Sequence, residues 1–356
     1  MSYKVVGKPW DYAGSVDVRD CKTSLECMQK AGLDFEVAKT ELYAKIPLNV
    51  MDIDSSLDKA NYHKKHDSEA HIHGKNLFIA CPNSYCTYRK DHDYPLGFVK
   101  QKYTIVQNRE AFKFFDDAVG ENKAKWETAG WFGNGERIFV SAKLPDITLV
   151  KGDPVDNYLL FTNSHDGSGG VKILFTPIRV ICQNTLTAAI RNATNYVSYR
   201  HTQSVHNNIE EAYKVLGISK KMQEHTSDVY NLLASIKMTD EDVMKYICEF
   251  NMTQEEAEKL LGHGNTYKQL VYRNGDAFRN SEISTKKLNV IHEMYDYYHS
   301  GAGQDKIAGT AWGAFNAVTG YYSNVDNSEG RKRMDSLLFG DKSRKLAAAI
   351  DYEFAV

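Results

Sequence analysis

A segment without carboxylates carries the side chains best suited to bind phosphate. Between Asp166 and Glu210 the sequence has no Asp or Glu, although these two residue types occupy 46 of its 356 positions. An Arg guanidinium binds phosphate through two parallel N–H groups, amides donate hydrogen bonds without adding charge, and a nearby carboxylate would repel the ligand. The candidate nucleic-acid ligands of this segment are Lys172, Arg179, Gln183, Asn184, Arg191, Arg200 and His201. The alternative is that the segment belongs to the apolar core and needs no acids.

Arg179 is the principal contact that this hypothesis predicts. It is expected at the end of a strand, directly before a helix over residues 181–199 whose free N-terminal amides favour a phosphate group. The glycine-rich stretch at 167–170 would let the backbone approach a ligand closely. Arg191 and Arg200 should point to roughly opposite faces of the helix. We therefore expect the three arginines to contribute unequally, with the largest part from Arg179.

The sequence NSHDG at residues 163–167 contains Ser, His and Asp side by side. A hydrolytic triad needs these groups to converge from separate elements, so adjacency in the sequence does not indicate one. Asp-Gly is typical of a turn, and we interpret Asp166-Gly167 in this way. The alternative is that His165 contacts a ligand or a neighbouring subunit. The sequence KGDP at residues 151–154 is likewise expected to form an ordinary turn.

A cluster of histidines and cysteines occupies residues 63–92. Its members are His63, His66, His71, His73, Cys81, Cys86 and His92. Structural zinc requires four ligands in compact pairs, and these pairs are loose. We expect solvated loops around one hairpin and no metal, with structural zinc as the alternative.

Common catalytic patterns are absent from the sequence. It contains neither the Gly-rich phosphate loop that ends in Lys-Ser or Lys-Thr nor the dinucleotide-binding pattern of three spaced glycines. No pair of carboxylates recurs at helical spacing with a supporting His, as a nuclease metal site would need. We therefore expect no cofactor, and a binding protein rather than an enzyme.

Composition restricts the setting of the protein. The formal net charge is −2, so any surface for nucleic acid must be local. No apolar run is long enough to span a membrane, and the N-terminus does not have the order of a secretory signal. Together with six scattered cysteines, this predicts a cytoplasmic protein with reduced thiols. The 22 tyrosines favour extensive interfaces, and we expect a homo-oligomer.

The order of expected elements predicts an α+β fold. Two strand-like runs flank Asn134-Gly135, a strong hairpin signal, and two further strands follow at 158–162 and 171–175. The helix at 181–199 should lie on this antiparallel sheet, giving a β-β-β-α-like core. Shorter helices are expected after Thr23 and Asn108, and after Thr253 in a region that is mostly helical from residue 209 onward. We place a boundary near residue 207, between an α+β core domain (1–207) and a helical C-terminal region (208–356).

Several long stretches of the sequence resemble one known family. They are residues 96–99, 106–112, 127–130, 160–168, 176–186, 200–202 and 310–319. Together they are similar to a phage/plasmid-like protein family that is labelled only as a domain of unknown function, and the likeness covers roughly residues 1–345. Members of that family occur in phages, prophages and plasmids, and the resemblance implies no reaction.

Two classes of function remain. The first is a non-catalytic nucleic-acid-binding protein of mobile-element DNA metabolism, with single-stranded DNA as partner and single-strand annealing or recombination as the process. The sheet-then-helix order is similar to the core of single-strand annealing recombinases, which is an analogy at the level of the fold. The second is an oligomeric protein-interaction or assembly factor of a phage or plasmid that does not bind nucleic acid. An enzyme of unknown class ranks third.

Overall fold

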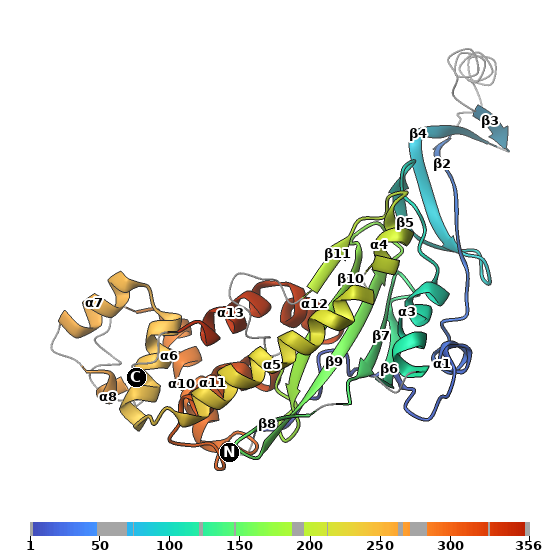
Figure 1. Cartoon of the computed structure of the whole chain (residues 1–356). Coiled ribbons are helices and arrows are strands. Elements are labelled where there is room, and N and C mark those ends of the chain that lie inside the picture. Colours follow the sequence, from blue (N-terminus) through green and yellow to red (C-terminus); the bar gives the residue numbers. More distant parts are fainter. Residues whose placement is uncertain are drawn as a thin grey trace.

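The computed structural model consists of a curved sheet, a smaller projecting sheet and a helical half (Figure 1). It describes residues 3–47, 70–73, 75–120, 124–145, 147–186, 196–211, 213–262, 266–270, 283–326 and 328–352. The antiparallel sheets and the helical C-terminal half confirm the predicted α+β class.

The larger sheet has seven strands, all antiparallel, in the order β1-β6-β7-β9-β10-β11, with β8 paired beside β9. Their bounds are β1 Ser15–Asp17, β6 Lys125–Phe132, β7 Arg137–Lys143, β8 Thr148–Val150, β9 Asp153–Ser164, β10 Val171–Arg179 and β11 Tyr196–Tyr199. The hairpin expected at Asn134-Gly135 joins β6 to β7, where Gly135 has a φ of 109° that favours glycine. The two strands predicted after it are confirmed within β9 and β10.

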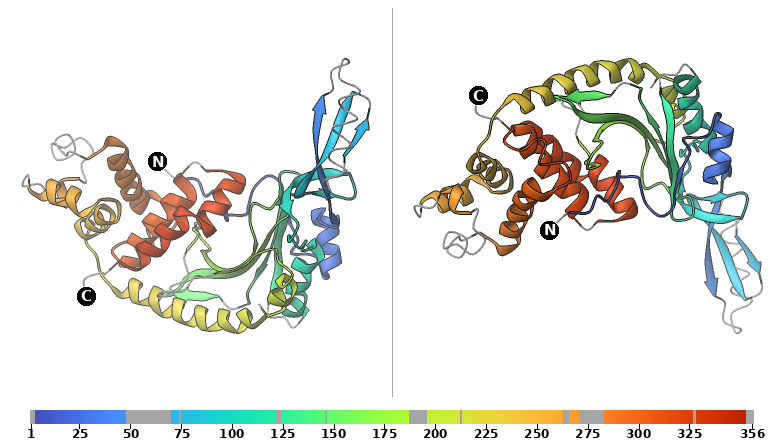
Figure 2. Two further views of the ribbon diagram at one scale, coloured as in Figure 1. Left: turned by 90° about the horizontal axis from the view of Figure 1, so that it is seen from above. Right: turned by 90° about the horizontal axis from the view of Figure 1, so that it is seen from below.

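Both faces of this sheet are buried. Successive residues of a strand point to opposite sides, and each side packs in a core. Ile138 and Val140 of β7 belong to the core beneath α1 (Ser24–Ala31) and α3 (Asn108–Gly120). Phe139, between them, belongs to a second core with Trp10 and with α12 (Gly330–Phe339). Figure 2 shows the sheet as a curved layer between these two groups of helices.

Local capping signals place the short helices. The Thr23 hydroxyl accepts a hydrogen bond from the Glu26 amide at the start of α1, and Gly32 ends that helix in the left-handed conformation. Thr253 and Glu256 form the expected reciprocal contacts at the start of α7. The helix predicted after Asn108 is confirmed as α3.

The prediction of a helix over 181–199 is wrong in its described parts. The chain turns directly after β10: the Gln183 amide donates to the Arg179 carbonyl, and Gln183 adopts a φ of 54°. Residues 196–199 form β11, because Tyr-Val-Ser-Tyr favours a strand and the free edge of β10 supplies its hydrogen-bond partners. Residues 187–195, with Arg191, lie outside the described part. The long helix of this fold is α5 (Tyr213–Ser235), which contacts β8.

The smaller sheet projects from the body as an arm (Figure 1). It contains β2 Val37–Pro47, β3 Ala70–His73, β4 Asn76–Arg89 and β5 Tyr94–Lys100, in which β4 pairs with the other three. The hairpin expected in the His- and Cys-rich stretch is β3–β4, and His71 and His73 lie exposed on β3. His63 and His66 fall outside the described residues.

The arm is fixed to the body at the NSHDG sequence. The Thr87 hydroxyl of β4 donates to the His165 carbonyl at 2.7 Å, and a Cβ at Gly97 of β5 would lie only 2.5 Å from the Cα of Asp166. The Asp166 carboxylate accepts hydrogen bonds from the amide and hydroxyl of Ser168, and Gly167 has a φ of 76°. These contacts confirm the interpretation of Asp166-Gly167 as a turn.

The second half of the chain is helical, and its main core also includes Val150, Val155 and Leu186 from the sheet half. Its helices are α4 Val205–Glu211, α5, α6 Asp240–Asn251, α7 Gln254–Gly262, α8 Tyr267–Leu270, α10 Thr285–Ser300, α11 Ala311–Gly320, the π-helix η2 Tyr321–Val325, α12 and α13 Asp341–Ile350. All residues of α11 are buried. The boundary predicted near residue 207 lies inside α4. None of the described helices is both long and apolar enough to cross a membrane.

His165 should make the fold sensitive to acid. Its side chain is fully buried, and its Nε2–H donates to Asn108 Oδ1 at 2.8 Å, while the Asn108 amide donates to the Leu33 carbonyl. Burial lowers the pKa of His165 to about 3. Since the unfolded pKa is about 6.5, the unfolded chain binds the proton first as the pH falls. The contribution of neutral His165 to the unfolding free energy is therefore complete above about pH 6.5. It is lost as the pH falls toward 3, by up to about 1.4 kcal/mol per pH unit.

Urea unfolding between pH 7.5 and pH 4.5 measures this effect. His165→Gln should flatten the decline in unfolding free energy, whereas His92→Gln, on an exposed turn of the arm, should leave it unchanged. Identical pH dependence of wild type and His165→Gln would show that other groups control acid sensitivity.

Candidate functional site

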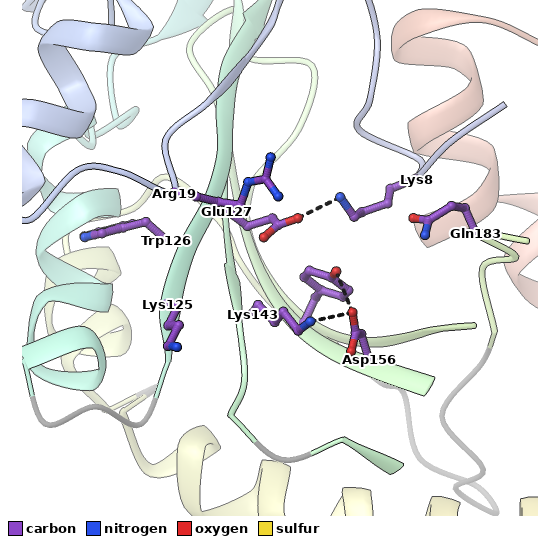
Figure 3. A pocket seen from close by; sticks show the side chains of 9 residues that line it. Lys8, Arg19, Lys125, Trp126, Glu127, Lys143, Asp156 and Gln183 are labelled. Atoms are coloured by element: carbon purple, nitrogen blue, oxygen red, sulfur yellow. Dashed lines mark hydrogen bonds and ion pairs between the residues drawn. The ribbon is translucent and has the colours of Figure 1, made fainter. Parts of the chain in front are cut away.

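A charged cavity opens beside the strands β6, β7 and β9, next to the N-terminal segment (Figure 3). Its volume is about 340 Å³. The residues that line it are Lys8, Arg19, Lys125, Trp126, Glu127, Lys143, Asp156, Tyr158 and Gln183. This "charged cavity" brings together four basic and two acidic side chains from segments far apart in the sequence.

Two ion pairs form the inner part of the charged cavity. Lys8 Nζ lies 2.8 Å from Glu127 Oε1, and Lys143 Nζ lies 2.6 Å from Asp156 Oδ2. Both acidic residues are only 8% exposed, so each needs a cation to offset the loss of hydration. Figure 3 shows the two pairs facing each other across the cavity.

Arg19 and Lys125 add positive charge at the rim. The Arg19 guanidinium pairs with Asp17 and remains largely exposed. Lys125 is exposed at the first position of β6, and among the described residues it has no ion-pair partner. Because Lys8, Lys143 and Arg19 are each paired with a carboxylate, Lys125 is the one cation of the described lining whose charge is not balanced, and it favours an anionic ligand.

The cavity also offers one acceptor and one donor for a neutral group. Asp156 Oδ1 is buried and, among the described residues, has no hydrogen-bond partner. Burial, with the charges of Glu127 and Asp156, raises the pKa of Tyr158, so its hydroxyl stays protonated. In the absence of a ligand this hydroxyl donates to Asp156 Oδ2 over a long distance of 3.4 Å. Cations at the rim and an acceptor inside suit a ligand that carries both phosphate and hydroxyl or amino groups.

The described residues include no group of three or more His, Cys, Asp or Glu side chains that could hold a metal ion. His165 is buried away from the cavity in the joint with the arm, so the charged cavity has no imidazole to act as general base.

The prediction for Arg179 is wrong, because the side chain is fully buried. Its Nε donates to Asp153 Oδ2 at 2.7 Å and one terminal nitrogen donates to the Gly303 carbonyl at 2.8 Å. Asn184 is buried as well and accepts hydrogen bonds from Tyr297 and Asn324. Neither side chain can reach a phosphate outside the protein, and both join the sheet to the helical half.

The remaining predicted ligands are dispersed. Gln183 lines the charged cavity. Lys172 is half-buried, with its ammonium 4.1 Å from the centre of the Phe339 ring. Arg200 is exposed just beyond β11, whereas His201 is buried against Tyr103 and donates from Nδ1 to the Thr104 carbonyl. Thus only Gln183 belongs to the site that the structure forms.

The basic residues of the site were missed because they are isolated in the sequence. The hairpin signal does not reveal the site either, because Lys125 lies opposite Lys143 only through an irregularity in the strand pairing between Trp126 and Thr128. The like charges of this pair are offset by Asp156, which comes from a third strand.

These features define an α+β protein with a cavity lined by four basic and two acidic residues. Residues 95–350 match the family described as Domain of unknown function (DUF932), and the chain belongs to that family. The match includes Lys125, Glu127, Lys143 and Asp156, whereas Lys8 and Arg19 precede it. No curated protein and no solved structure matches the chain.

Removal of Lys143 should destabilise the protein through its carboxylate partner. Lys143→Ala leaves the buried Asp156 carboxylate without its cation, at a cost of about 1–3 kcal/mol in unfolding free energy. The second change Asp156→Asn in the same chain should recover part of that loss, since no buried charge then remains. Urea unfolding at neutral pH measures both variants. Equal stability of Lys143→Ala and wild type would show that the pair is fully compensated by water.

Proposed function

We propose that this protein binds nucleic acid, with single-stranded DNA as its ligand, and that it catalyses no reaction itself. The observation that supports this proposal is Lys125, an exposed cation of the charged cavity that no described carboxylate balances, beside the largely exposed Arg19. Phosphate groups dominate the affinity of proteins for nucleic acids, and Lys and Arg side chains provide it. A role in the DNA metabolism of phages or plasmids, including strand annealing or recombination, is the corresponding biological proposal.

The size and chemistry of the cavity fit one unit of a flexible strand. Its volume of about 340 Å³ is near the lower end of the range for ligand pockets, which is about 300–1,000 Å³. Arg19 and Lys125 at the rim would hold phosphates. Asp156 Oδ1 and the Tyr158 hydroxyl would bind the N–H or O–H groups and the acceptors of the sugar or base. A net charge of −2 does not oppose this, since the cations are concentrated locally.

Charge reversal at the rim tests the proposal. Lys125→Glu should weaken binding of a labelled oligothymidylate by at least about tenfold, equal to about 1.4 kcal/mol. It should also reduce the slope of log affinity against log salt by about 0.7 for the lost contact. Fluorescence anisotropy at several salt concentrations measures both values.

The matched control is Lys286→Glu, an exposed lysine of α10 outside the charged cavity, which should leave affinity and slope unchanged. If the wild type shows no salt-dependent binding to single-stranded or double-stranded nucleic acid, the proposed function fails. If both variants weaken binding equally, the charged cavity is not the site.

The arm favours a second candidate function, assembly with further copies of the chain. Its edge strand β2 has 11 residues. The Gln107 side-chain amide forms hydrogen bonds with the backbone N–H and carbonyl of Val37 at the start of β2. From Val37 onward, no described strand pairs with the outer edge of β2. Exposed edge strands are templates for pairing with another chain.

We propose an antiparallel pairing of β2 with a second copy in which Glu41 of each strand lies opposite Lys45 of the other. Both residues are exposed. The charges are thus complementary between identical strands.

Charge exchange tests the register. Lys45→Glu places two acids opposite each other and should shift the protein to a smaller species in light scattering coupled to gel filtration. The double variant Glu41→Lys, Lys45→Glu restores complementarity and should restore the larger species. A wild type that is monomeric at micromolar concentration would exclude assembly through β2.

A further inference from the structure

A second cavity lies between the β8–β9 turn and the helical half. Its volume is about 480 Å³. It is lined by Val150, Lys151, Gly152, Asp153, Pro154, Ile181, Ala234, Lys306, Ile307, Thr310 and Trp312. We call it the Asp153 cavity. It shares no lining residue with the charged cavity.

One oxygen of the Asp153 carboxylate accepts hydrogen bonds, and the other has no donor among the described residues. Oδ2 accepts from Arg179 Nε at 2.7 Å and from Trp312 Nε1 at 2.8 Å. Oδ1 is buried and has no hydrogen-bond partner among the described residues, and Asp153 is only 7% exposed. A buried acceptor without a donor is uncommon in folded proteins, because its lost hydration is not replaced. Asp153 is a lining residue of the cavity, so its unpartnered Oδ1 points to a ligand with an N–H or O–H donor.

The charge of Asp153 is already balanced by Arg179, so the donor of the ligand need not be cationic. Two lysines lie elsewhere in the lining. Lys151 Nζ donates to the Ala234 carbonyl at 3.0 Å, and Lys306 is exposed. Their positive charges favour an anionic group at the mouth of the cavity.

The wall between these two ends is apolar. Val150, Ile307 and Trp312 are buried, and Ala234 completes the surface. At Gly152, whose φ is 90°, a Cβ would meet no atom within 4 Å, so the backbone of the turn borders open space. Apolar walls with a few placed polar groups are typical of small-molecule sites.

We propose that the Asp153 cavity binds a nucleotide, with the base between the apolar walls, a base N–H group on Asp153 Oδ1 and the phosphate at Lys151 and Lys306. The site does not depend on the proposed function, because its residues are separate from the charged cavity. The same chemistry is offered by a free mononucleotide and by the phosphorylated end of a DNA strand.

Calorimetric titration of the full chain with GMP tests the proposal. GMP should bind at least tenfold more tightly than ribose 5-phosphate, which has no base, or guanosine, which has no phosphate. Lys306→Glu should weaken GMP at least tenfold, and Ala234→Leu, which fills the cavity, should abolish binding. Lys306 is exposed, so its variant tests the site even if Ala234→Leu fails to fold.

Two controls separate this site from the charged cavity. Lys125→Glu and Lys286→Glu should each leave GMP affinity unchanged. Competition between GMP and a 5′-phosphorylated oligonucleotide identifies a strand end as the source of the ligand, and lack of competition identifies a free nucleotide. Absence of GMP binding at millimolar concentration, or binding that neither Lys306→Glu nor Ala234→Leu alters, would overturn the proposal. Either result leaves the test of Lys125→Glu on oligonucleotide binding intact.

Discussion

The buried carboxylate of Asp153 is the constraint on which the arrangement of the two halves depends. A charge at this depth costs several kcal/mol unless a partner compensates it. Arg179 from the end of β10 and Trp312 from α11 both donate hydrogen bonds to this carboxylate, although Trp312 lies 159 residues after Asp153 in the sequence. These two contacts join the sheet to the helical half at one buried charge. Asn184 repeats this connection nearby through its hydrogen bonds to Asn316, Tyr297 and Asn324.

This use of Arg179 changes the meaning of the segment without carboxylates. Arg179 and Asn184 fit the alternative that this segment belongs to the core, because both side chains are buried and form their contacts inside the protein. The cations available to a ligand come instead from the N-terminal segment and from the hairpin β6–β7. The basic side chains of the charged cavity thus come from other elements than this segment, which contributes Gln183.

The projecting arm separates a second role from the body. Its base is fixed by Thr87 and Gly97 against His165 and Asp166, so the sequence NSHDG serves as a joint rather than a reactive site. Beyond that joint, β2 extends away from β8, β9 and the helical half (Figure 1). The proposed ligand binding in the body and the proposed pairing through the arm therefore use separate parts of the molecule.

The sequence by itself determined the elements whose signals are local. The Asn134-Gly135 hairpin, the helices after Thr23 and Thr253, and the mostly helical second half were predicted because turns and caps involve residues only a few positions apart. The helix predicted over residues 181–199 is wrong in its described parts, because residues 196–199 pair as a strand with β10.

Only the tertiary structure decided the sites. Lys8, Lys125 and Lys143 meet because the N-terminal segment lies against two strands, and Asp153 meets Trp312 because two layers dock. Such contacts depend on burial and on the compensation of charge across the whole fold, and no spacing along one chain encodes them. The physical reason is that a side chain acquires its role from its partners, and these partners are distant in sequence.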